Sequence, residues 1–252
     1  MAKGHRMADA RSSFPFHKDW WPAPVTLVSC GANKPGANRG ANIWVVGVLG
    51  GPCDDPPLLT ISPRSEMYSY KLIQELGEFV INFPTVQMIR EMEYCGTHTG
   101  VEVDKWKACG FTAIPGKVVR VPLIAECPVN FECTVEKELR FKRSDGSEGE
   151  HVMVIGRIVQ VNAIDRCVID GRVQWDMVDT IYRARPRTWR ALGPVLGYDC
   201  RKDPLPKPTE AAEVVNQRVA LLDRLADAIR TTPYPTQVTT SSVHSRPKRN
   251  ET

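Results

Sequence analysis

The sequence predicts a mainly β fold of the α+β kind, built around an antiparallel barrel. The 252 residues include 20 prolines. Typical usage of about 5% would give roughly 13, and proline interrupts helix interiors. Apolar and polar residues alternate from Val129 to Glu136, which is typical of a half-buried strand. Short β-branched runs separated by Gly- and Pro-rich turns also favour strands over long helices.

The first predicted elements are short strands that follow a loose arm at residues 1–19. Residues 24–30 and 42–49 are expected to form two strands, because both runs are apolar and a Gly/Pro/Asn-rich loop joins them. A turn over residues 50–57 then leads into a short strand at 58–61.

Helical spacing appears next, from Met67 to Leu76, and Gly77 is suited to end that helix. A strand is expected over residues 79–83. Thr85 can cap a second helix, which would contain Met88, Ile89 and Met92. Downstream, the alternating strand that begins at Val129 is expected to pair with residues 151–161 across a polar turn at 144–149.

The C-terminal part has a different character. Residues 165–201 include Tyr182, Trp189 and a Gly-containing segment at 191–198. Residues 203–208 form a Pro-rich linker, and residues 210–230 show helical spacing that fits either a coiled-coil seam or packing on the barrel. The predicted domains are therefore an arm at 1–19, a barrel domain at 20–201, and a linker, helix and disordered tail at 202–252.

Composition excludes several classes of function. A net charge of +4, from 33 basic and 29 acidic residues, is too small to indicate nucleic-acid binding. No window approaches the roughly 18 consecutive apolar residues of a membrane span, and residues 1–16 lack the apolar core of a secretory signal. The eight cysteines show neither a C-x-x-C pair nor zinc spacing. We expect a cytoplasmic protein with reduced thiols and no metal site.

Two segments carry groups that suit an anion. Residues 62–70 place Arg64 and several hydroxyls where a strand ends and a helix begins, which is where free backbone N–H groups favour negative charge. Residues 95–106 combine hydroxyls and glycines with Lys105. Arginine, lysine and hydroxyls together suit a phosphate monoester. The alternative is that Arg64 and Lys105 are solvated surface charges.

Seven short motifs in this order resemble the flavin reductase-like family, which includes flavoredoxins and FMN-binding split-barrel proteins. They occur from about Trp21 to Val161. The motifs are Pro22-x-Pro24-Val25, the Asn42-led strand, Cys53–Pro57, Ser62–Arg64 with Tyr68–Tyr70, Gly77–Asn82, Cys95–Trp106, and Glu126–Val129.

The resemblance implies a six-stranded antiparallel Greek-key split barrel with short flanking helices. In relatives an aromatic, Gly-rich C-terminal strand completes the barrel or a wall of its site, and we expect the segment with Tyr182 and Trp189 to do so here. The C-terminal helical appendage expected after residue 201 has no counterpart in the family pattern.

The resemblance further implies a homodimer that holds FMN without a covalent bond near the subunit interface. NADH or NADPH would be a transient co-substrate, and the electron acceptor would be a small molecule or a protein. Because the flavin itself carries the redox chemistry, no catalytic side chain is assigned.

The resemblance also assigns roles in the cofactor site. Arg64 and Lys105 would face the phosphate, helped by hydroxyls, while Gly96 and Gly100 would let a loop close over the ribityl chain. Backbone at 42–47 and 62–63 would edge the ring. The full predicted set is Asn42, Val45, Val46, Gly47, Ser62, Pro63, Arg64, Tyr68, Ser69, Cys95, Gly96, Thr99, Gly100 and Lys105.

Several alternatives remain open in the sequence. The protein is predicted to be an NAD(P)H oxidoreductase, with a non-enzymatic electron carrier as the alternative and an interaction protein as a third possibility. Cys95 is expected to pack at a helix end rather than act as a redox thiol, and His98 to be a surface-loop residue. Val45 and Met67 depart from the residues common in relatives, Thr and Arg.

Overall fold

The computed structural model describes residues 22–32, 40–184 and 188–191. The predictions for the N-terminal arm, for Trp20 and Trp21, and for residues 202–252 lie outside these described residues, as does Cys200.

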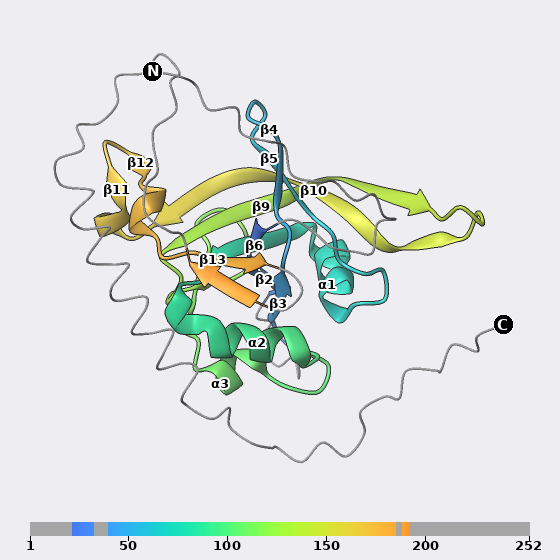
Figure 1. The fold of residues 1–252 in the computed structure, drawn as a ribbon, viewed down its shortest axis with the longest axis horizontal. Coiled ribbons are helices and arrows are strands. Elements are labelled where there is room, and N and C mark those ends of the chain that lie inside the picture. The colour runs from blue at the N-terminus through green and yellow to red at the C-terminus, as the bar shows by residue number, and fades with distance from the viewer. Residues whose placement is uncertain (1–21, 33–39, 185–187, 192–252) are drawn as a thin grey trace, which may run out of the picture. The chain divides into compact units, whose positions relative to one another are not determined.

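A seven-stranded antiparallel sheet forms the body of the described chain (Figure 1). This confirms the predicted mainly β fold, although the sheet has one strand more than the six implied by the resemblance. In spatial order its strands are β3 (Asn42–Val46), β2 (Thr26–Cys30), β6 (Glu78–Phe83), β9 (Val129–Lys142), β10 (Glu148–Ala163), β5 (Leu58–Ile61) and β4 (Gly50–Cys53).

Strand β4 occupies part of the segment predicted as a turn. Gly50 pairs with Thr60 and Cys53 with Leu58, so this stretch folds back on β5 as a hairpin. The pairing is irregular between the two ends, and this irregularity accommodates Pro52, which has no N–H to donate to a ladder. The turn itself is confined to residues 54–57.

The long hairpin of β9 and β10 confirms the period-two pattern and extends further than that pattern predicts. The two strands remain paired out to Lys142 and Glu148, beyond the other strands of the sheet (Figure 1). Side chains at 140–148 are exposed. Alternation is lost there because neither face of the ribbon is buried, which is why the sequence pattern stops near Glu136.

Three short α-helices lie along the sheet: α1 (Tyr68–Leu76), α2 (Ile89–Thr97) and α3 (Lys105–Cys109). Helix α1 ends at Gly77, as predicted, with φ of 70°, a conformation that glycine adopts at little cost. Thr85 does not cap the second helix through its side chain. A 3₁₀ turn, η1 (Val86–Met88), comes first, and α2 begins after it.

Smaller elements complete the described chain. Tyr182 and Trp189 lie on a hairpin that pairs with the start of the chain, and Tyr182 lies opposite both Pro24 and Arg190. These strands form a separate three-stranded sheet and line neither cavity described below, because they pair with Ala23–Pro24 and not with the main sheet, so they do not complete the barrel or the site wall as expected. The elements are β1 (Ala23–Pro24), β13 (Ile181–Ala184), β14 (Thr188–Ala191), β7 (Ala113–Ile114), β8 (Leu123–Ile124), β11 (Val168–Ile169), β12 (Arg172–Val173), η2 (Asp165–Cys167) and η3 (Trp175–Met177).

The core includes one fully buried carboxylate. Glu132 on β9 is 0% exposed, and its two oxygens accept hydrogen bonds from the backbone N–H groups of Lys117, Val118 and Val119 and from the amide of Asn162, at 2.7–2.9 Å. Burial raises the pKa of this carboxyl, but the four hydrogen bonds outweigh it and the net shift is downward. Glu132 therefore anchors the segment at 117–119 to the sheet.

All seven cysteines in the described residues are free thiols, as expected, and most are buried. Burial raises the pKa of Cys30 to about 12 and raises the pKa of Cys127 and Cys133 as well. These three are packing residues. Within the described ranges, no helix is long and apolar enough to cross a membrane.

Candidate flavin site

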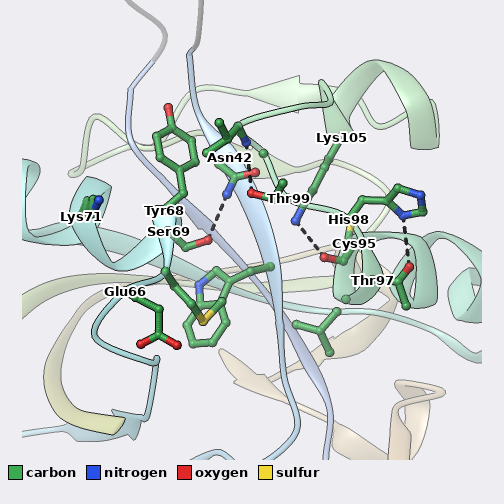
Figure 2. A pocket seen from close by; sticks show the side chains of 16 residues that line it. Asn42, Glu66, Tyr68, Ser69, Lys71, Cys95, Thr97, His98, Thr99 and Lys105 are labelled. Carbon is green, nitrogen blue, oxygen red and sulfur yellow. Dashed lines mark hydrogen bonds between the residues drawn. The ribbon is translucent and has the colours of Figure 1, made fainter. Parts of the chain in front are cut away.

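A cavity of about 400 Å³ lies between the start of β3, the start of α1 and the loop that joins α2 to α3 (Figure 2). This volume falls in the range of small-molecule sites, about 300–1,000 Å³. An adjoining cavity of about 380 Å³ shares part of the same wall. The main cavity is lined by Asn42, Trp44, Val45, Glu66, Met67, Tyr68, Ser69, Lys71, Cys95, Gly96, Thr97, His98, Thr99, Gly100, Val101 and Lys105.

The beginning of α1 gives the cavity a positive end. Met67 precedes the helix and its side chain caps none of the N–H groups, and the first turn carries no acidic residue. The N-terminal N–H groups of a helix lack intrahelical partners and favour an anion. Tyr68 and Ser69, the first two residues of α1, line the cavity. This end of the helix is therefore suited to a negatively charged ligand group.

Three distant chain segments meet at Asn42. Its buried side chain donates from Nδ2 to Ser69 Oγ at 2.9 Å, which joins the start of β3 to the start of α1 (Figure 2). Gly100 packs directly against the same amide, and a Cβ at that position would collide with Asn42 Oδ1. Gly100 is therefore required by the close approach of this loop to Asn42.

Lys105 is buried at the first residue of α3, with 4% of its surface exposed. Its Nζ donates to Ile43 O at 2.7 Å and to Cys95 O at 2.8 Å, and an ammonium has a third N–H to offer. Burial lowers its pKa, an effect that the nearby thiols, Cys95 foremost, partly oppose. Lys105 thus holds β3, α2 and α3 together and lines both cavities.

Local structure explains how α3 presents this lysine. Asp104 caps the helix, accepting a hydrogen bond from the N–H of Lys107, and Trp106 Nε1 donates to Ala41 O at 3.0 Å. The carboxylate of Asp104 is therefore engaged by the backbone of its own helix.

Nine of the fourteen predicted positions line the main cavity, and five do not. Arg64 is one of the five: its guanidinium is half-exposed and lies 3.9 Å from Glu66 and 3.8 Å from Glu150. Gly47 lies against the side chain of Arg183. The other positions outside the lining are Val46, Ser62 and Pro63.

The structure also shows the surroundings of Cys95 and His98. Cys95 is buried near the end of α2, as expected, and its Sγ lies 3.7 Å from Cys109 Sγ. His98 is half-buried rather than a free surface residue. Its ring stacks on Tyr94 with centroids 3.9 Å apart, and Nδ1 lies 3.1 Å from both Tyr94 O and Thr97 Oγ1.

Sequence reasoning missed several wall residues. Lys71 lies in the first turn of α1, three residues after Tyr68, and this helical spacing places the two on the same face. The period that predicts the helix could therefore have identified Lys71. Trp44 lies two residues after Asn42, on the same face of β3. The remaining missed residues are Glu66, Met67, Thr97 and Val101.

Comparison with known proteins agrees with this fold. The family model for the flavin reductase like domain matches residues 19–171. A protein of Archaeoglobus fulgidus is 32% identical over 141 residues, which is 56% of this chain and 72% of that protein. The structure of flavoredoxin from Methanosarcina acetivorans has a TM-score of 0.66 and 26% identity, covering 76% of this chain and 97% of that one. Flavoredoxin of Desulfovibrio vulgaris (Miyazaki F) has a TM-score of 0.66 and 27% identity, covering 76% and 98%.

The chain therefore belongs to the flavin reductase-like family. Its fold is shared by the flavoredoxin structures and, at a TM-score of 0.58 and 17% identity, by a protein with a split-barrel domain from Shewanella frigidimarina. The family supports a flavin-related function.

Proposed function

We propose that this chain binds FMN in the described cavity and is an oxidoreductase that moves a hydride from NADH or NADPH to the flavin and on to an acceptor. The observation that carries the proposal is the positive end of the cavity. The uncapped start of α1 and the buried Lys105 ammonium border the same space, and together they provide the donors that a phosphate monoester requires.

The residues present fit such a cofactor. Hydroxyls of Ser69 and Thr99 line the same cavity as Lys105, so the wall offers a phosphate several donors. Lys71 adds a second cation to the wall, on the α1 side in Figure 2. Gly100, with no side chain, leaves the loop close to Asn42. The carboxylate of Glu66 is in the same wall, and its neighbour Arg64 offsets part of that negative charge.

The protein's part in the reaction is to bind and orient. When bound, FMN supplies the hydride acceptor, so the chain needs no acid, base or nucleophile of its own for that step. Lys105 and the start of α1 would hold the phosphate, and β3 would support the ring. Val101, at 39% exposure on the wall, leaves an apolar surface at which a nicotinamide could stack.

The binding half of the proposal is tested by titrating the purified protein with FMN and with riboflavin, which lacks the phosphate, while following flavin fluorescence. A hydrogen bond to a charged group contributes about 1.5–3 kcal/mol, so we expect FMN to bind about 10- to 150-fold more tightly. Equal affinities would remove the phosphate site from the proposal. Absence of binding by either flavin would end it.

The second candidate is a flavin-binding electron carrier that a partner protein reduces. The two flavoredoxin structures favour considering it, because they share this fold at 26% and 27% identity. Anaerobic stopped-flow mixing of the FMN-loaded protein with NADH and, separately, NADPH distinguishes the candidates. Bleaching of the flavin absorption by either nucleotide supports the enzyme, and failure of both supports the carrier.

We further propose that the protein acts as a homodimer in the cytoplasm, with a small-molecule or protein acceptor. Free thiols suit a reducing compartment, and exposed apolar residues such as Trp175 and Ile169 offer surface for a second subunit. Light scattering coupled to size-exclusion chromatography measures the mass. A mass of about 28 kDa, the value for one chain, would contradict the dimer.

A further inference from the structure

Two cysteines from neighbouring helices lie in contact beneath the cavity. Cys95 comes from α2 and Cys109 is the last residue of α3, two helices that lie side by side in Figure 1, and their Sγ atoms are 3.7 Å apart. The thiols of Cys30, Cys53 and Cys133 each lie within hydrogen-bonding distance of a backbone carbonyl. Cys109 Sγ likewise lies 3.7 Å from Glu91 O, but it also contacts the second thiol. The contact between Cys95 and Cys109 places two oxidisable sulfurs together.

The two thiols differ in access. Cys95 is 2% exposed, whereas Cys109 is half-buried, so a reagent from solvent reaches Cys109 first. The hydrogen bond with Cys95 lowers the pKa of Cys109, and Lys105 acts in the same direction, while burial and the carboxylate of Glu91 oppose them. Cys109 is thus the more available thiolate, and thiolate is the reactive form.

We propose that Cys95 and Cys109 are a redox-active dithiol that forms an intramolecular disulfide by exchange with a low-molecular-weight disulfide. The Cys109 thiolate attacks one sulfur of that disulfide, and one small thiol leaves. Cys95 then attacks the Cys109 sulfur, and its proton passes to the second small thiolate, which leaves as a thiol. The two cysteines lose two electrons, which reduce the external disulfide to two thiols.

Closure of this bond reaches the cavity through Lys105. A disulfide needs its sulfurs about 2.05 Å apart, closer than the 3.7 Å found here. Helix α3 has only five residues, with Lys105 first and Cys109 last, and Lys105 Nζ donates to the carbonyl of Cys95 itself. Drawing Cys109 toward Cys95 therefore shifts the lysine that borders the cavity. We expect the disulfide form to bind FMN several-fold more weakly, a consequence that rests on the proposed function, whereas the disulfide itself does not.

The disulfide is tested on the full chain without added flavin. The protein is equilibrated with mixtures of glutathione and glutathione disulfide, free thiols are blocked with N-ethylmaleimide, and intact mass and peptide mapping follow. We expect the oxidised protein to carry two fewer N-ethylmaleimide groups than the reduced protein, with both lost in the same step. Peptide mapping should show a disulfide link between Cys95 and Cys109. No paired loss in the most oxidising mixture, or a link mapped to any other pair, including one with Cys200, would overturn the proposal.

Variants sharpen this test. Cys109→Ser and Cys109→Ala should abolish the paired loss, and circular dichroism shows whether each variant is folded. Cys53→Ser is the matched control, because Cys53 is also half-buried but lies on β4, away from the pair. It should form the link as the wild type does. A paired loss that persists in both folded Cys109 variants would refute the assignment.

A second readout separates this inference from the proposed function. FMN affinity is measured for the reduced protein, for the oxidised protein, and after dithiothreitol. The expected result is a several-fold loss on oxidation that dithiothreitol reverses and that both Cys109 variants lack. Equal affinity of the two forms, with the link mapped, would overturn the coupling to the cavity. If neither form binds FMN, the proposed function fails while the mapped link still supports the dithiol.

Discussion

Replacing Gly100 with alanine tests whether the cavity depends on the close approach of this loop to Asn42. A Cβ at position 100 would collide with the Asn42 amide, which in the wild type donates to Ser69 Oγ at 2.9 Å. The amide must move, and that hydrogen bond is lost. Leaving a buried polar group without its partner costs about 1–3 kcal/mol.

The same free energy is expected to appear in flavin binding. If FMN requires the wild-type placement of Asn42 and Ser69, binding must restore it, and the affinity of Gly100→Ala falls by about 5- to 150-fold. Fluorescence titration with FMN measures the affinity, and urea unfolding measures stability alongside. Gly51→Ala is the matched control, because a Cβ there meets nothing within 4 Å. It should leave both quantities unchanged.

Two results would refute this reasoning. One is a folded Gly100→Ala protein whose FMN affinity lies within twofold of wild type, since the loop would then tolerate the extra carbon. The other is an equal loss in Gly51→Ala, because a glycine-to-alanine change in open space would then account for the effect without any contact at Asn42.

Three further predictions concern charge and packing. Glu132→Gln leaves two of the four converging donors without an acceptor, so urea unfolding should show a loss of about 2–6 kcal/mol. Because the pKa of Glu132 is lowered in the fold, its advantage over the glutamine variant should be complete above about pH 4.5 and shrink as pH falls below it; a constant difference would contradict this. Burial lowers the pKa of Lys105, so the lysine should lose its charge at a pH below the usual lysine value of 10.5. The ratio of FMN affinity to riboflavin affinity should therefore fall as pH rises toward 10.5 and should not change in Lys105→Met. A wild-type ratio that stays constant up to pH 10.5 would contradict a phosphate contact by Lys105. Gly156→Ala would press a methyl group into the ring of Phe79 and should lower the free energy of unfolding by about 1–3 kcal/mol, and an unchanged denaturation midpoint would show that the core gives way.

Local signals in the sequence were sufficient for six of the seven strands of the main sheet and for two of the three α-helices in the described residues. The alternation that begins at Val129 predicts β9 because each side chain faces either the core or solvent. Gly77 predicts the end of α1 because its φ of 70° is unfavourable for other residues. Each of these features depends on neighbouring residues alone, so it can be predicted from the sequence without knowledge of the fold.

The five predicted positions outside the cavity lining show where local signals stop. Arg64 follows a strand end, as predicted, and its backbone bridges to His151 on β10. That contact brings Glu150 to 3.8 Å from its guanidinium. The guanidinium thus lies between the nearby carboxylate of Glu66 and the carboxylate of Glu150, which is far along the chain. No local pattern around Arg64 could indicate the second contact.

The same contrast explains why the cavity is built from separated motifs. Asn42 is bonded to Ser69, and Lys105 is bonded to the carbonyls of Ile43 and Cys95, so each bond joins two motifs that are distant in sequence. Several residues of the sequence motifs therefore support the cavity by fixing the position of residues from other motifs. A flavin contact and a supporting contact demand different tests: a supporting residue moves FMN and riboflavin affinities together, whereas a phosphate contact moves only the first. Lys105 both borders the proposed phosphate end of the cavity and supports the wall through its two hydrogen bonds to carbonyl groups. We therefore expect Lys105→Met to lower the affinity for riboflavin as well as for FMN, with the larger loss for FMN.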